Sequence, residues 1–244
     1  MKTAVRHLAG TAFVLAFCAC IAVISSLCSA ERASLACGRV EVLFCDTLRF
    51  VDSTDVLESV FENYGPCIGE RLDSVHLAAV EAAVLSREPV SSCQAWTTDD
   101  GVLHILVGQR TPAVRFTDGR QSVYADTGGR LFPMTGGYEA DVPVVTGRIP
   151  EDGDWAVSMV KMLGWMHRNG WNGTISAVES DRSGNISLRA CGGERFNIGQ
   201  PEGFEEKFGL IKKYYDYIVP EKGEGAYKTV NVNFKNQIIC RKDT

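Results

Sequence analysis

The chain has 244 residues, a formal net charge of −5 and a hydrophobic content of 45%. Such a composition is ordinary for a packed globular protein and excludes a disordered or low-complexity chain. The acidic balance leaves no basic footprint for phosphate groups, which excludes a typical nucleic-acid-binding protein.

The N-terminal part is dominated by the segment Leu8–Ala30, which contains no Asp, Glu, Lys or Arg. A helix of this length would cross a hydrocarbon core of about 30 Å. We therefore predict a cytoplasmic tail over residues 1–7 and a single transmembrane helix over residues 8–30. The alternative is a cleaved signal peptide, because the segment ends in the small residues Cys28-Ser29-Ala30.

Charged residues on either side of this segment predict its orientation. Lys2 and Arg6 precede it, whereas Glu31 and Arg32 follow it and cancel each other. The positive-inside rule then keeps the N-terminus in the cytoplasm and the C-terminus in the periplasm. We expect a single-pass type II protein of the inner membrane, with a linker over residues 31–37 leading to the folded part.

A first folded module is predicted over residues 38–116. Alternation over Arg39–Leu43 indicates a strand. Asp52 offers an N-cap to a first helix, and a second helix begins near Asp73. The turn Asp99–Gly101 then joins two further strands into a hairpin, so the predicted order is β-α-α-β-β.

A β-rich domain with helices packed on its sheet is predicted over residues 117–244. Glycine pairs such as Gly128-Gly129 separate short apolar runs, as between short strands. Helical spacing of apolar residues predicts helices over residues 154–169 and 204–215. The last strand is expected over Thr229–Lys235, where core-facing and outward-facing residues alternate; those facing the core are Val230, Val232 and Phe234.

The sequence contains none of the common catalytic motifs. The G-x-S-x-G, H-E-x-x-H and Walker patterns do not occur. The histidines are scattered, and none lies beside a cysteine in a zinc-binding pattern. We therefore expect a protein that is not an enzyme, with no catalytic residue, no cofactor and no metal site.

The cysteines beyond the hydrophobic segment would lie in a compartment where disulfides form, but no C-x-x-C pair occurs among them. The sequence is compatible both with disulfide bonds and with buried free thiols for the six cysteines Cys37, Cys45, Cys67, Cys93, Cys191 and Cys240.

Four blocks of sequence, in this order, resemble one known family. Val80–Pro112 joins a helix to a hairpin whose closing strand ends in Gln-Arg-Thr-Pro. Val123–Pro133 contains the pattern Y-x-D-x-x-G-x-x-x-P, and Asp141–Gly147 reads D-V-P-V-V-T-G. The fourth block, Tyr227–Cys240, is similar to the same region in the Bacteroidota branch of the family named next. The ordered set resembles the FtsQ/DivIB family of bacterial cell-division proteins over essentially the whole chain.

The resemblance implies a domain plan and a fold class. Residues 38–116 look like the polypeptide-transport-associated (POTRA) domain of that family, and residues 117–244 look like its C-terminal β-domain. The implied fold is α+β: a single N-terminal transmembrane helix, a POTRA domain, and a β-rich domain with helices on its sheet.

The resemblance also implies a scaffold that recruits and holds the divisome proteins FtsB and FtsL at the division septum. Its binding surface would lie around the last strands of the β-domain. A terminal strand with one free edge offers unpaired N–H and C=O groups to a partner strand. The expected partner-binding residues are Tyr227, Thr229, Val230, Asn231, Val232, Asn233, Phe234 and Lys235.

Two other functions are compatible with the same residues. One is a POTRA-type factor for the assembly or export of outer-membrane proteins, although only one such module is predicted. The other is a membrane-anchored periplasmic enzyme whose ionisable groups come together from distant parts of the sequence.

Overall fold

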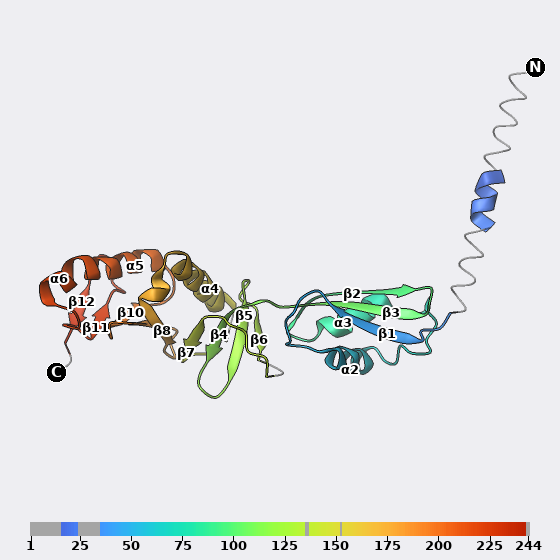
Figure 1. The fold of residues 1–244 in the computed structure, drawn as a ribbon, viewed down its shortest axis with the longest axis horizontal. Helices are drawn as coiled ribbons and strands as arrows, with labels where there is room; N and C mark the ends of the chain where they lie inside the picture. Colours follow the sequence, from blue (N-terminus) through green and yellow to red (C-terminus); the bar gives the residue numbers. More distant parts are fainter. Residues whose placement is uncertain (1–15, 24–34, 135–136, 152, 243–244) are drawn as a thin grey trace, which may run out of the picture. The chain divides into compact units, whose positions relative to one another are not determined.

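The computed structural model describes residues 16–23, 35–134, 137–151 and 153–242. These residues form two compact units (Figure 1). The first unit comprises the described residues up to Thr47 together with Val51–Gln109, and the second comprises Leu48–Phe50 and the described residues from Arg110 onward. The fold class is mixed α+β.

The predicted transmembrane helix requires a correction. Within Leu8–Ala30 the structure describes only residues 16–23, which are helical; the rest of that segment lies outside the described residues. A helix of this length rises about 12 Å, whereas a hydrocarbon core measures about 30 Å. In the described part of the chain, no helix has the length and apolar character needed to span a bilayer. The fold class that included such a helix is therefore wrong.

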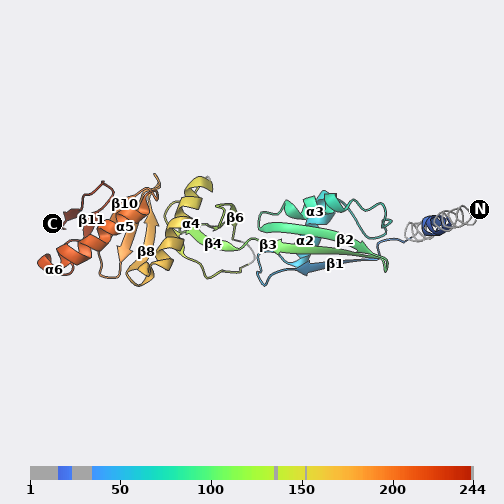
Figure 2. The ribbon, with the colours of Figure 1, turned by 90° about the horizontal axis from the view of Figure 1, so that it is seen from above.

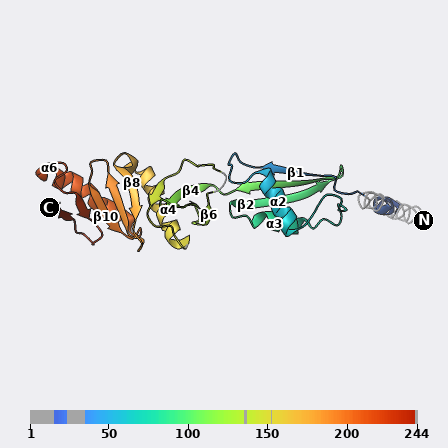
Figure 3. The same cartoon turned by 90° about the horizontal axis from the view of Figure 1, so that it is seen from below.

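The first unit is a three-stranded sheet with two helices on one face (Figure 3). The strand order is β1-β3-β2, with β1 parallel and β2 antiparallel to β3. The chain order β-α-α-β-β agrees with the predicted one. Its elements are β1 (Arg39–Phe44), α2 (Ser53–Asn63), α3 (Leu77–Leu85), β2 (Val90–Thr98) and β3 (Val102–Gln109).

Helix α2 begins where the sequence predicts. The Asp52 carboxylate accepts a hydrogen bond from Asp55 N at 2.9 Å, and the Asp55 carboxylate accepts one from Asp52 N at 2.9 Å. This capping box satisfies backbone N–H groups that the first turn leaves unpaired. Val56 and Val60 then point into the core, where they are buried. Helix α3 begins at Leu77, a few residues after the predicted start.

The second unit is built on one nine-stranded sheet, in the order β12-β11-β10-β9-β8-β7-β4-β5-β6. Helices α4 and α5 lie over one of its faces, as seen from above in Figure 2. The strands are β4 (Pro112–Thr117), β5 (Ser122–Asp126), β6 (Leu131–Pro133), β7 (Val144–Thr146), β8 (Ile175–Ser180), β9 (Ile186–Ala190), β10 (Arg195–Gly199), β11 (Thr229–Asn231) and β12 (Ile239–Arg241). The helical segments are α4 (Gly153–Arg168), η1 (Trp171–Gly173), α5 (Phe204–Lys213), η2 (Tyr214–Ile218) and α6 (Val219–Lys222).

The core of the second unit lies between this sheet and its helices. Helix α4 contributes Met159 and Met162, and α5 contributes Phe208 and Ile211; all four are 0% exposed. These residues recur at helical spacing, which is why a single face of each helix is buried. Strand β4 belongs to this sheet, so the two compact units divide between Gln109 and Arg110.

Phe50 explains why Leu48–Phe50 belongs to the second unit. Its ring packs against Tyr124, Phe132 and Tyr138, with centroids 5.3, 5.5 and 5.0 Å away. Offset and edge-to-face packing of this kind adds stability beyond the area buried.

The cysteines whose pairing the sequence leaves open are free thiols in this structure. Cys37 and Cys67 are buried, and Cys93 and Cys240 are partly buried. Burial, with a smaller contribution from the charge of Glu81, raises the pKa of Cys93 to about 11. Burial likewise raises the pKa of Cys67 to about 11.

Candidate functional site

The predicted binding strand is shorter than expected and is not the edge of the sheet. Strand β11 ends at Asn231, and it lies between β10, to which it is parallel, and β12, to which it is antiparallel. Alternation over Thr229–Lys235 predicts a longer terminal strand, so that prediction is wrong in both length and position. The edge strand at this end of the sheet is β12, residues Ile239–Arg241.

Only part of the predicted core-facing set is buried. Val230 is 0% exposed and Val232 is 1% exposed, whereas Phe234 is 50% exposed. After Val232, whose N–H donates to Asn197 O at 3.0 Å, the chain leaves the sheet. Gln237 N then donates to Phe234 O at 3.2 Å, and Asn236 adopts a positive φ of 58°. This turn ends the alternation, because asparagine tolerates the left-handed conformation that the turn needs.

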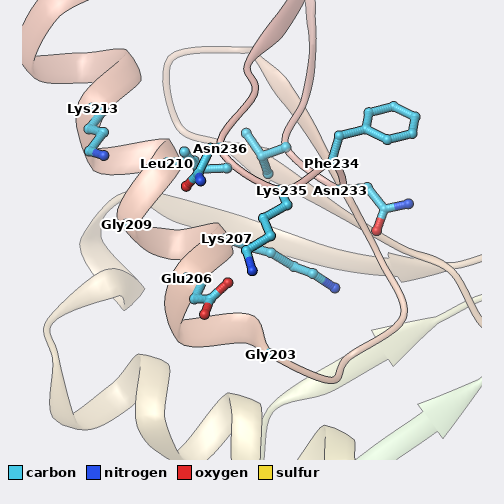
Figure 4. A pocket seen from close by; sticks show the side chains of 11 residues that line it. Gly203, Glu206, Lys207, Gly209, Leu210, Lys213, Asn233, Phe234, Lys235 and Asn236 are labelled. Carbon is cyan, nitrogen blue, oxygen red and sulfur yellow. The ribbon is translucent and has the colours of Figure 1, made fainter.

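The loop over residues 232–236 and helix α5 enclose a groove of about 490 Å³ (Figure 4). Lys207 and Lys213 come from α5, and Lys235 comes from the loop, while Glu206 is the one acidic residue in the lining. The groove is therefore basic, although the whole chain is acidic. Figure 4 shows the Phe234 ring at the groove, pointing away from helix α5.

Lys207 is the most constrained of these lysines. Its Nζ donates a hydrogen bond to Gln200 O at 2.7 Å. Burial lowers the pKa of Lys207, and the nearby Glu202 carboxylate opposes that shift. Lys207 is thus partly buried and tethered by a hydrogen bond, whereas Lys213 and Lys235 are exposed.

The outward residues of β11 form a polar strip with the neighbouring strands. Asn231 lies opposite Asn197 of β10, and Asn197 lies opposite Ser187 of β9, whose hydroxyl donates to Asn197 Oδ1 at 2.9 Å. Asn231 Oδ1 accepts from Asn233 N at 2.9 Å. The prediction that Asn231 faces outward, away from the core, therefore agrees with the structure.

Asn233 packs closely against a glycine. Gly199 has a φ of +67°, and a Cβ added there would overlap the side-chain amide of Asn233. The same two residues line a polar pocket of about 330 Å³ that also includes Asn197 and Asn231. The structure therefore brings Asn231 and Asn233 together in the polar pocket, while Val232, Asn233 and Lys235 line the groove.

The first two members of the predicted set are both partly buried. Tyr227 is partly buried against the core, and Lys242 Nζ lies 5.9 Å from its ring centroid. Thr229 is half-buried and is paired on both sides, opposite Arg195 and Arg241. Sequence reasoning missed β12, where Ile239 is 40% exposed. A three-residue strand gives almost no periodic signal, so only the Ile238-Ile239 dipeptide could have indicated it.

The two edges of the nine-stranded sheet differ in their capacity to pair. Strand β6 ends in Pro133, which has no N–H to donate, and prolines of this kind protect natural sheet edges. Strand β12 contains no proline, and in the described part of the chain it pairs with β11 alone. In an antiparallel pair, alternate backbone groups point away from the partner, so the outer edge of β12 has N–H and C=O groups that pair with no strand in the described part of the chain.

Among the described residues, no group of three or more His, Cys, Asp or Glu side chains could hold a metal ion. The candidate site therefore consists of the backbone edge of β12, the exposed side chains of Phe234 and Ile239, and the lysines of the groove.

These features define a two-unit α+β protein whose second unit ends in a sheet edge suited to pairing. The family described as FtsQ/DivIB, C-terminal related, matches residues 111–241, which is more than half of the chain and covers β4 to β12. The chain belongs to the FtsQ/DivIB family, as the four sequence blocks predict. It is thus a cell-division protein of the septum that interacts with other divisome proteins. A comparison with curated proteins found no match.

Proposed function

We propose that this protein is a non-enzymatic scaffold that holds FtsB and FtsL at the septum by adding a partner strand to β12. One observation carries the proposal: β12 is the end strand of the nine-stranded sheet, and its outer edge is unprotected in the described residues. An added strand would gain main-chain hydrogen bonds without disturbing the existing core.

Two exposed apolar side chains also support the proposal, one on β12 and one in the loop between β11 and β12. Phe234 is 50% exposed and Ile239 is 40% exposed, although both belong to residue types that usually lie inside. A few side chains that become fully buried at the centre of an interface supply most of its binding free energy. We propose Phe234 and Ile239 as the side-chain contacts that accompany backbone pairing.

The charge of the neighbouring groove indicates the chemistry of the partner. Lys235 and Lys213 are exposed at the groove, and Arg241 and Lys242 are exposed at β12. An acidic partner segment with one or two large apolar residues would complement this surface, and its association would be faster at low salt. Within the predicted set, Asn233–Lys235 would contact the partner, and Tyr227–Val232 would support the edge from within.

We further propose that the first unit is the POTRA domain of the scaffold. Its support is the order β1-α2-α3-β2-β3 and the mixed three-stranded sheet with both helices on one face.

The test replaces the two exposed apolar residues one at a time. Phe234→Glu and Ile239→Glu are each expected to weaken binding of a soluble FtsB segment about tenfold or more. The matched control is Tyr217→Glu on η2, where the side chain is 70% exposed and lies outside the proposed surface. Calorimetric titration gives the affinity, and thermal melting shows that each variant folds. If both variants bind as tightly as the wild type, these side chains are not the contacts.

Backbone pairing is tested separately by hydrogen exchange. Binding of the FtsB segment should slow exchange of the β12 amides, residues 239–241, whereas the edge strand β6 should exchange as before. Equal exchange at β12 with and without FtsB would exclude strand addition there. Proline at Val232 is a poor probe, because it would remove a hydrogen bond of the sheet itself.

A further inference from the structure

A third pocket, of about 480 Å³, lies in the second unit, between η1, the β9–β10 turn and the helical run α5-η2-α6. Trp171, Cys191, Glu194, Lys212, Tyr215 and Glu224 are among the residues that line it. None of its lining residues also lines the basic groove between α5 and the loop over residues 232–236. The pocket is therefore a separate site, and the proposed scaffold function does not use it.

Glu194 is the unusual residue of this pocket. Its side chain is 3% exposed, and its Oε2 atom is buried with no hydrogen-bond partner among the described residues. The carboxylate lies over Gly192, where an added Cβ would be 2.5 Å from Oε2. A buried carboxylate without a partner is costly, and such groups in proteins are normally paired with a cation or a donor.

Neighbouring charges do not supply that partner. Across the described residues, no Lys, Arg or His nitrogen forms an ion pair with Glu194. Lys212 and Glu224 are exposed residues of the pocket lining with opposite charges. The charges of Lys212 and Glu224 cancel, so the Glu194 carboxylate gives the pocket a net negative charge.

Two aromatic residues of the lining are held in place by their neighbours. The Trp171 ring lies 4.9 Å from the Phe208 ring, and the Tyr215 ring lies 5.8 Å from the Phe196 ring. Aromatic faces attract cations, more strongly when the site is shielded from water. Aromatic walls combined with a buried carboxylate favour an organic cation over a neutral or anionic ligand.

We infer that this pocket binds an organic cation, an ammonium or guanidinium group on an apolar stem, with Glu194 as its counter-ion. The cation could belong to an arginine or lysine side chain of a protein partner, or to a free amine. Both sources share the chemistry that the pocket recognises, and the experiment below separates them.

The experiment is an NMR titration of the full-length protein that follows the backbone amides of Cys191, Gly192 and Thr174. The first pair of probes is n-butylguanidinium and its neutral analogue n-butylurea. The second pair is the peptide Gly-Gly-Arg-Gly-Gly and the same peptide with citrulline in place of arginine. We expect only the charged member of each pair to give saturable shifts. Tighter binding of the peptide supports a protein side chain, and tighter binding of the free guanidinium supports a small amine.

Variants test the role of Glu194. Glu194→Gln is expected to weaken binding of the charged probe about tenfold or more, and Glu205→Gln, an exposed glutamate of α5 outside the pocket, should leave it unchanged. Because Gln carries no charge to be buried, Glu194→Gln should also raise the melting temperature of the free protein.

Several results would overturn the inference. Two results with the wild-type protein would be enough to overturn it. One is that neither charged probe binds, and the other is that the charged and neutral members of a pair bind equally well. Unchanged affinity in Glu194→Gln would do the same. Lys212→Met and Tyr214→Phe test for an internal partner of Glu194. If either variant lowers the melting temperature, and does not lower it when Glu194→Gln is also present, that residue is a partner of Glu194 and the inference is overturned.

Discussion

At the scale of single residues, the core of the second unit holds a tyrosine with unusual chemistry. Tyr214 is 0% exposed, and its hydroxyl has no hydrogen-bond partner among the described residues. Its ring packs edge-on against Phe196, with centroids 5.4 Å apart. Burial, followed by the charge of Glu194, raises the pKa of Tyr214 to about 12 from an ordinary value of 10.0.

This shift predicts how stability depends on alkaline pH. Between pH 10 and about 12 the unfolded chain loses the Tyr214 proton while the folded protein keeps it. Stability from the neutral phenol is therefore fully present below pH 10 and is lost as the pH rises toward 12. Tyr214→Phe should reduce that loss by on the order of 2 kcal/mol.

The measurement is denaturant unfolding at a series of pH values, followed by the tryptophan fluorescence of the second unit. Tyr217→Phe is the control, because its ring is 70% exposed. If Tyr214→Phe and the wild type lose stability in parallel, the phenol of Tyr214 does not titrate in the way described.

At the scale of elements, the short strand β7 joins the two halves of the large sheet. It is parallel to β4 on one side and to β8 on the other. Gly147, which follows it, donates its N–H to Thr117 O at 2.8 Å, and Arg148 N donates to Ser180 Oγ at 2.8 Å. These bonds continue the connection between β4 and β8 past the end of β7.

The close approach at this point requires glycine. Gly147 has a φ of +114°, and a Cβ added there would overlap the backbone carbonyl of Ser180. We expect Gly147→Ala to destabilise the second unit by roughly 2–4 kcal/mol, because backbone strain and a backbone clash act together. Gly119→Ala separates the two effects: its φ is +86°, but nothing lies within 4 Å of the added Cβ.

For Gly119→Ala we expect a loss of about 1 kcal/mol from the positive φ alone. Thermal melting and denaturant unfolding of the two variants provide the comparison. Equal stability of the two variants would show that Ser180 can move away at little cost.

Helix α5 continues directly into η2 and α6, and η2 is a π-helical turn. Such turns insert an extra residue into a helix and often occur at functional sites. Here the turn carries Tyr214 into the core and Tyr215 into the lining of the cation pocket.

At the scale of the whole molecule, family membership makes a prediction about cells. Depletion of the protein should produce filaments, because septation stops while growth continues, and a fluorescent fusion should localise to the septum. Wild-type protein should restore division, whereas a Phe234→Glu/Ile239→Glu double variant should not, despite an unchanged amount of protein. Normal division after depletion would contradict a role in septation, and full rescue by the double variant would contradict the proposed surface.

Local patterns allowed much of the fold to be predicted. The capping residue Asp52, the turn at Asp99–Gly101 and the helical spacing over residues 154–169 each depend on residues close in sequence. Their elements appear in the structure within a few residues of the predicted positions. The four ordered blocks likewise identified the family, because a family resemblance needs no knowledge of which strands pair.

What the tertiary structure alone decided is the order of strands in the sheet. The parallel pairs β4–β7, β7–β8 and β10–β11 join segments that are distant in sequence, and no local pattern predicts them. Alternation correctly identified Val230 and Val232 as core residues, but it extended the strand to Phe234, which is exposed. The edge strand is β12 and not β11, because a later, three-residue segment pairs with β11. That pairing depends on hydrogen bonds between separate segments of the chain rather than on periodicity.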